Sequence, residues 1–238
     1  MQATMMHSPM TVQMIMQHGR RVFPGSRVGT FDGAAMTYTS YREIADNAAR
    51  LAAALQDLGI APGDRVATFS WNNTAHLEAY LGIPAMGAIM HTVNIRLSAE
   101  HIAYIINHAE DRVLLLDASL IEVFAPVLPL LQSVEHILLI GAGALDSDIA
   151  CLDYRDFVAG HDPLQSWPEI DETAAAAICY TSGTTGNPKG VVYSHRTTFI
   201  HSLASRATNT FGICERDRIL LLPAMFHANA WGLPYSGW

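Results

Sequence analysis

The chain has 238 residues, of which 50% are hydrophobic and 15% are charged, and this balance is typical of a folded globular protein. Its formal net charge of −8, with no cluster of lysine and arginine, argues against a nucleic-acid partner. Three widely spaced cysteines, Cys151, Cys179 and Cys214, indicate reduced thiols in a cytoplasmic protein. No apolar run is long enough for a transmembrane segment, and the amino-terminal residues lack the continuous apolar stretch of a signal peptide.

The first half of the chain alternates strand and helix patterns. Phe31–Tyr38 predicts a hairpin that turns at Asp32 and Gly33. Ser40 and Glu43 form a capping-box pair, which is typical of a helix start, and Gly59 stands where that helix should end. Further elements are then expected in this order: a strand Arg65–Ser70, a helix from Thr74 that is interrupted at Pro84, a strand Ala88–Val93, a helix after Ser98, and strands Arg112–Leu116 and Ile137–Ile140.

Repeated strand-then-helix units predict an α/β fold with mostly parallel sheets flanked by helices. Asp146–Pro168 is rich in Asp, Gly and Pro, and we expect it to connect two subdomains, residues 1–165 and 166–238. The second subdomain should contain the strands Ala174–Cys179, Gly190–Ser194 and Ile219–Leu222.

The loop Tyr180–Gly190 reads Tyr-Thr-Ser-Gly-Thr-Thr-Gly-Asn-Pro-Lys-Gly and directly follows an apolar strand. Its glycines, Gly183, Gly186 and Gly190, permit the positive φ angles that turn amides toward one point, where hydroxyls and one lysine can add donors. Pro188 before the lysine and a strand after it distinguish the loop from a Walker A motif. The residues predicted to bind polyphosphate are Thr181, Ser182, Gly183, Thr184, Thr185, Gly186 and Lys189.

Thr181–Gly190 resembles the phosphate-binding signature of the adenylate-forming, or AMP-binding, enzymes. Pro223–Tyr235 resembles the segment that follows it in bacterial medium- and long-chain fatty acyl-CoA synthetases, and the similarity extends over essentially the whole chain. Members of that family are much longer. The resemblance therefore implies that these residues form the incomplete N-terminal part of a large domain, and that this portion alone is inactive.

The resemblance implies that a carboxylic acid, here a fatty acid, is activated by ATP to an acyl-adenylate and then transferred to CoA. Lys189 and His227 would be the catalytic residues, and His227 and Trp231 would bind the acid. Thr181 would bind Mg²⁺ together with a glutamate beyond Trp238. Trp231 would gate an acyl tunnel, with packing in the core as the alternative. The resemblance also allows a homodimer.

Three alternatives remain for the function. The first is a CoA ligase for short thioether acids such as 3-methylmercaptopropionate, and the second is a non-catalytic nucleotide-binding module. The third, a P-loop kinase or ATPase, is disfavoured by Pro188 and Gly190. A Ser194–His195 nucleophile pair is not expected, because adjacent residues at a strand end face opposite sides.

Overall fold

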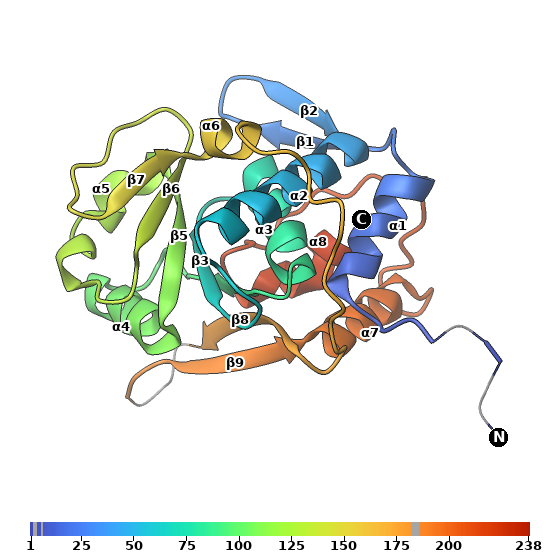
Figure 1. Ribbon diagram of the computed structural model, residues 1–238. Coiled ribbons are helices and arrows are strands. Elements are labelled where there is room, and N and C mark those ends of the chain that lie inside the picture. Colours follow the sequence, from blue (N-terminus) through green and yellow to red (C-terminus); the bar gives the residue numbers. More distant parts are fainter. Residues whose placement is uncertain (2–3, 6, 182–185) are drawn as a thin grey trace.

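The computed structural model describes the whole chain except residues 2–3, 6 and 182–185 (Figure 1). Its helices are α1 (Val12–Val22), α2 (Tyr41–Asp57), α3 (Thr74–Ala85), α4 (Ala99–Ala109), α5 (Ile121–Phe124), α6 (Tyr154–Ala159), α7 (His195–Arg206) and α8 (Leu233–Ser236). Its strands are β1 (Arg27–Phe31), β2 (Met36–Ser40), β3 (Arg65–Phe69), β4 (Ile89–Thr92), β5 (Asp111–Asp117), β6 (His136–Ile140), β7 (Ala150–Asp153), β8 (Ala175–Thr181) and β9 (Lys189–Ser194).

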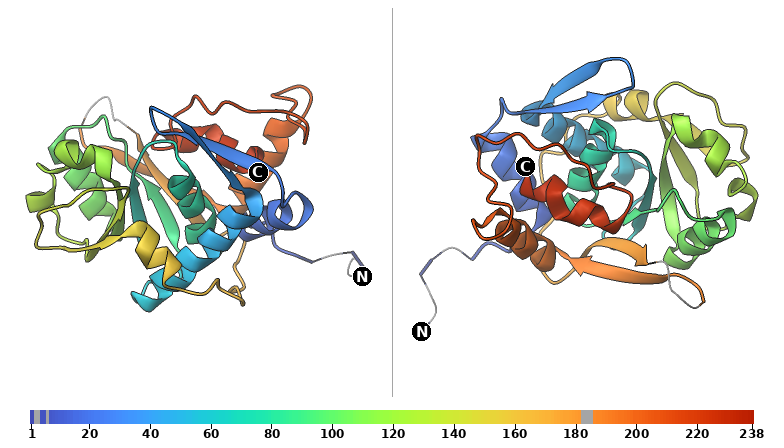
Figure 2. Two further views of the ribbon diagram at one scale, coloured as in Figure 1. Left: turned by 90° about the horizontal axis from the view of Figure 1, so that it is seen from above. Right: turned by 180° about the vertical axis from the view of Figure 1, so that it is seen from behind.

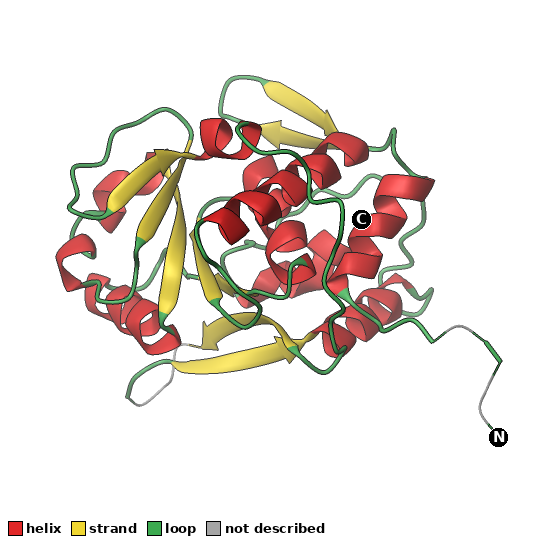
Figure 3. Ribbon diagram, in the orientation of Figure 1, coloured by secondary structure: helices red, strands yellow, loops and turns green. Residues whose placement is uncertain are grey.

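One seven-stranded sheet, in the order β7-β6-β5-β3-β4-β8-β9, organises the molecule. All its neighbouring strands run parallel except β8 and β9, which are antiparallel. One face packs against α1, α2 and α3 and the other against α4 and α5, so helices cover both sides (Figure 3). The predicted α/β class with a mostly parallel sheet is confirmed.

Local capping signals place the helices as expected. Ser40 and Glu43 form the predicted capping box of α2, and Gly59 has a φ of +79°. Helix α3 differs, because it continues through Pro84 to its end at Ala85. Proline has no N–H to donate to the carbonyl of Tyr80, four residues earlier, and the Tyr235 hydroxyl donates to that carbonyl instead at 3.1 Å.

Two expectations about the second half were wrong. Asp146–Pro168 is not a plain connection, because it contains β7, which extends the sheet edge beside β6, and α6. Ile219–Leu222 is not a strand, because no strand among the described residues pairs with it. The sheet takes strands from both sides of the predicted boundary at residue 165, and that boundary stays a prediction.

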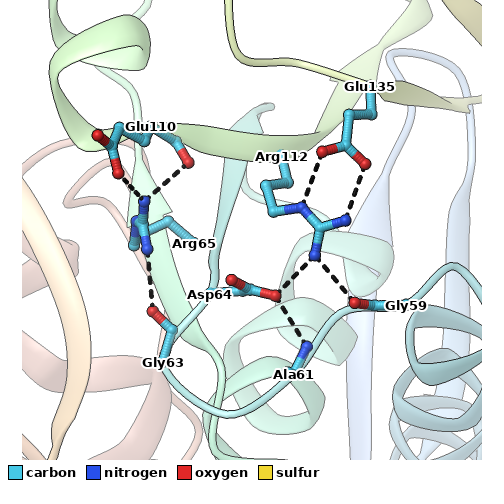
Figure 4. A network of polar contacts seen from close by, with 8 residues as sticks. All are labelled: Gly59, Ala61, Gly63, Asp64, Arg65, Glu110, Arg112 and Glu135. Atoms are coloured by element: carbon cyan, nitrogen blue, oxygen red, sulfur yellow. Dashed lines mark hydrogen bonds and ion pairs between the residues drawn. The ribbon is translucent and has the colours of Figure 1, made fainter.

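The amino ends of β3 and β5 are joined by a network of ion pairs (Figure 4). Arg112 forms a two-pronged pair with Glu135, at 2.9 Å for each contact, and a further pair with Asp64 at 2.8 Å. Arg65 pairs with Glu110 at 2.7 Å. These contacts lie where the parallel strands begin. The carboxyl ends of the same strands lie at the opposite end of the sheet.

The last described residues pack against α1, as the views in Figure 2 show. Trp238 donates from its indole N–H to the carbonyl of Met16 at 3.1 Å, and its ring stacks on Tyr41 at 4.2 Å between centroids. No helix in the described part of the chain combines the length and apolarity needed to cross a membrane.

Candidate functional site

The candidate phosphate loop joins β8 to β9, and its ends, Thr181 and Lys189, are partners in the antiparallel ladder. The exposed Thr181 hydroxyl donates to the Lys189 carbonyl over a long 3.4 Å. Lys189 is exposed, is the single lysine of the sequence, and makes no ion pair with any described residue. Four further predicted residues lie outside the described part: Ser182, Gly183, Thr184 and Thr185.

The glycines of this loop serve two different purposes. Gly186 has a φ of +93°, which confirms the expected left-handed turn. Gly190 does not adopt a positive φ, contrary to expectation. It lies instead against the ring of Tyr180, where an added Cβ would be 3.1 Å from the nearest ring carbon. The ring of Tyr180 thus packs directly against the backbone at the start of β9.

The second predicted segment, around His227, lies at the carboxyl end of β4. Strands β4 and β8 are parallel neighbours with Thr92 opposite Cys179, so the phosphate loop and the residues after β4 leave the sheet at the same edge. There the Asn94 amide nitrogen is 3.4 Å from Nδ1 of the exposed His227. The carboxyl edge of a parallel sheet is where α/β proteins usually bind ligands.

The residues after His227 form a left-handed turn. Ala228, Asn229, Ala230 and Trp231 have φ values between 47° and 56°, and Gly232 follows at 70°. Each non-glycine residue in this conformation costs about 1–2 kcal/mol, so the surrounding contacts must hold the turn. One such contact is the Thr92 hydroxyl, which donates to the buried Asn229 side-chain oxygen at 2.9 Å.

Trp231 points away from the core. Its side chain is 62% exposed, which argues against the core-packing alternative, whereas the gating role stays a prediction. Its carbonyl lies 2.8 Å from Nε2 of His201 on α7, and because a carbonyl can only accept, that ring nitrogen donates. The same imidazole fills the space beside Gly232, where a Cβ would approach within 2.6 Å.

Ser194 and His195 have structural roles, as predicted. The Ser194 side chain caps α7 by accepting from the backbone N–H of Thr197. His195 is buried and accepts from the backbone N–H of Val12 at 3.2 Å, and burial lowers its pKa to about 4. Because Nδ1 accepts this bond, the proton of the neutral ring is on Nε2, and neither nitrogen is free to accept a proton from Ser194.

His108 and His91 lie beside the ring of Tyr180, at the start of the phosphate loop. Tyr180 Oη is 2.7 Å from His108 Nδ1, and burial, its largest cause, raises the pKa of Tyr180 to about 12. The phenol therefore keeps its proton at neutral pH, and its oxygen shares one hydrogen bond with the imidazole. Farther in, His91 and Asp111 are fully buried and 2.6 Å apart, and burial raises the pKa of Asp111 although His91 opposes the shift.

No three His, Cys, Asp or Glu side chains gather to hold a metal anywhere in the described part of the chain. An Mg²⁺ ion carried by a nucleotide needs fewer protein ligands, because phosphate oxygens supply several of them. The Thr181 hydroxyl is exposed and donates its proton to a carbonyl, which leaves its oxygen lone pairs available. This residue therefore fits the predicted role of a magnesium ligand.

Sequence reasoning did not single out Thr92, Asn94 and His201, although they hold the turn after His227. Thr92 and Asn94 lie 137 and 133 residues from their partners, and no local pattern indicates a contact over such a distance. His201 contacts Trp231 from the exposed side of a helix, where a histidine is unremarkable in a sequence.

Comparison with known proteins identifies a family and several similar enzymes. A family profile described as AMP-binding enzyme matches residues 14–237. A 3-methylmercaptopropionyl-CoA ligase of Ruegeria pomeroyi is 42% identical over 98% of this chain and 44% of its own length. A medium-chain-fatty-acid–CoA ligase of Ectopseudomonas oleovorans is 39% identical over 98% of this chain and 43% of its own length. The chain thus spans less than half the length of either relative.

The fold has close counterparts among solved structures. An anthranilate CoA ligase, solved in complex with anthranoyl-AMP, superposes with a TM-score of 0.82 at 22% identity. The match covers 99% of this chain and 45% of that one. At this identity the likeness concerns the fold alone.

Proposed function

This chain belongs to the family of AMP-binding enzymes, and from that premise we propose that it provides the phosphate- and acid-binding part of an acid–CoA ligase. A carboxylate oxygen attacks the α-phosphorus of ATP, and the bond to the bridging oxygen of pyrophosphate breaks, which gives acyl-AMP. The thiol of CoA then attacks the acyl carbon, loses its proton, and displaces AMP. A cytoplasmic location and a homodimer belong to the same proposal.

One observation carries the phosphate part of this proposal. Lys189 is an exposed cation without an ion pair among the described residues, and it lies where β9 begins, directly after the turn at Gly186. Its ammonium group would hold the β- and γ-phosphates and stabilise the charge of the departing pyrophosphate. Mg²⁺, for which Thr181 is the proposed ligand, would neutralise further phosphate charge when bound.

The acid would bind at the carboxyl end of β4. His227 is exposed there, and its imidazole could stabilise the charge that develops on the α-phosphate. Trp231 is the proposed contact for the acyl chain. We favour a medium- or long-chain fatty acid as substrate, with 3-methylmercaptopropionate as the second candidate, because ligases for both kinds of acid are among the relatives.

The decisive variant is Lys189→Ala in the complete gene product that carries these residues. We expect acid-dependent exchange of pyrophosphate into ATP to fall by about 100-fold, because the leaving group loses its main charge partner. Lys189→Arg keeps the charge and should retain more exchange than Lys189→Ala. As a control, Arg216→Ala removes an exposed cation that is not among the predicted site residues and should leave exchange intact.

Octanoate and 3-methylmercaptopropionate, compared at equal concentrations, would separate the two substrate candidates. Unchanged exchange in Lys189→Ala would refute the assigned role. Release of ADP instead of AMP would point to a kinase or ATPase, and nucleotide binding without any exchange would favour the non-catalytic module.

A further inference from the structure

We propose that Asn72 is a positioning residue that fixes the acid-binding segment, defined here as residues 221–231, against the carboxyl edge of the sheet. This inference rests on the proposed function, because it is that proposal which gives the segment a role in acid binding. Asn72 lies in the short loop between β3 and α3, and its partners follow 149 to 153 residues later in the sequence.

The side-chain amide of Asn72 forms hydrogen bonds, both as a donor and as an acceptor, with the backbone of one short segment. Its nitrogen donates to the carbonyls of Leu221 and Pro223, each at 3.0 Å, and its oxygen accepts from the N–H of Met225 at 2.7 Å. A side-chain amide has two donor hydrogens and an acceptor oxygen, and all are engaged here. Few other residue types could make this set of bonds from one position.

These bonds replace the pairing that a strand would receive from a neighbour. The preceding residues pair with no strand in the described chain: the Leu222 N–H donates to the Leu220 carbonyl in a tight turn at 3.0 Å, and Leu220 and Leu222 are each 79% exposed. Backbone groups that are partly removed from water need partners, and the amide of Asn72 supplies them. The carbonyl of Met225 accepts from the Tyr80 hydroxyl, so this residue is held through both its N–H and its C=O.

The same loop also contacts the next residue of the segment. The Trp71 ring meets the ring of Phe226 edge to face, with centroids 5.9 Å apart, and Phe226 is 3% exposed. Met225 and Phe226 directly precede His227, and the left-handed turn follows. A shift of Asn72 would therefore move His227 and Trp231, while Asn72 forms no hydrogen bond with the described residues of β8, β9 or the phosphate loop.

The test compares Asn72→Ala with wild type in the complete gene product, using octanoate and 3-methylmercaptopropionate in pyrophosphate exchange. We expect the KM for the acid to rise about tenfold, the equivalent of about 1.4 kcal/mol, while the KM for MgATP stays unchanged. Hydrogen–deuterium exchange should accelerate in peptides that cover residues 221–231 and remain normal elsewhere. A general loss of stability would raise both KM values or lower only the amount of active protein.

Asn107→Ala is the matched control, because Asn107 bridges a different loop in the same manner. Its amide donates to the carbonyl of Leu130 at 2.8 Å and accepts from the N–H of Gln132 at 2.9 Å, on the α4 side of the sheet. This variant should leave both KM values unchanged. If Asn72→Ala does not fold, Asn72→Asp replaces it: that variant keeps the acceptor for Met225 but puts a carboxylate oxygen beside the two carbonyls, so it should also raise the acid KM and leave the KM for MgATP unchanged.

An unchanged acid KM, an equal rise in the KM for MgATP, or the same effect in Asn107→Ala would overturn the role of Asn72. A wild-type protein that activates neither acid would refute the proposed function. It would also refute the acid-binding role of residues 221–231. The two failures are therefore distinguishable, since the first occurs in an active enzyme and the second in an inactive one.

Discussion

His76 illustrates how a single buried side chain can control the response of this protein to pH. The imidazole is fully buried, with Nδ1 3.0 Å from the carbonyl of Trp71 and Nε2 2.9 Å from the Thr68 hydroxyl. Because the carbonyl only accepts, Nδ1 carries the proton, and Nε2 of the neutral ring accepts from Thr68. A second proton would place a charge in the core. Burial accordingly lowers the pKa of His76 from 6.5 to about 4.

This shift predicts a loss of stability on acidification. Between pH 6.5 and pH 4 the unfolded state binds a proton that folded His76 does not, so the stabilisation is complete above pH 6.5 and is lost as the pH falls. At pH 5 the free energy of unfolding should be about 2 kcal/mol lower than at pH 7 because of this group. Urea denaturation at pH 7 and pH 5 should show a smaller loss in His76→Gln than in wild type. The exposed His101→Gln should keep the full loss, and equal losses in all three proteins would contradict the prediction.

At the scale of elements, the crossing of α2 and α3 depends on one glycine. A Cβ added to Gly82 would lie 2.5 Å from the backbone carbonyl oxygen of Ala48, which cannot move without bending α2. Gly82→Ala should therefore lower the free energy of unfolding by about 2 kcal/mol, although alanine normally favours a helix. Gly25→Ala, with no atom within 4 Å of the new Cβ, is the control and should change it by less than about 0.5 kcal/mol. Denaturant midpoints of the two variants would decide.

The elements also show which structural signals are local. The capping box at Ser40 and the glycine at Gly59 act within a few residues, so the bounds of α2 could be predicted. Strand β7 has four residues, too few for a clear pattern, and it exists because β6 lies beside it. The apolar stretch at Ile219–Leu222 has the composition of a strand but pairs with no strand in the described part of the chain. Composition alone does not distinguish these two cases.

For the whole molecule, the sequence predicted the candidate site in part. Lys189, His227 and Trp231 could be named from their motifs, because each motif is contiguous. Their common location at one edge of the sheet depends on the order of the strands, which places β4 beside β8. The residues that hold the acid-binding segment, Asn72 and Thr92, could not be named, since their contacts arise only when the chain folds.

Thirteen arginines supply every other fixed cationic side chain of this sequence, so Lys189 is its one side-chain amine. An amine-selective acylating reagent should therefore modify a single side chain in these residues, at the end of the phosphate loop where β9 begins. The labelling rate then reports whether a nucleotide is bound at that loop. MgATP should slow the labelling of the peptide that contains Lys189, as measured by mass spectrometry. AMP, which lacks the β- and γ-phosphates, should protect it much less. Equal labelling rates with and without nucleotide would contradict contact between Lys189 and the terminal phosphates. Chemical footprinting can thus test the nucleotide site even in protein that turns over no substrate.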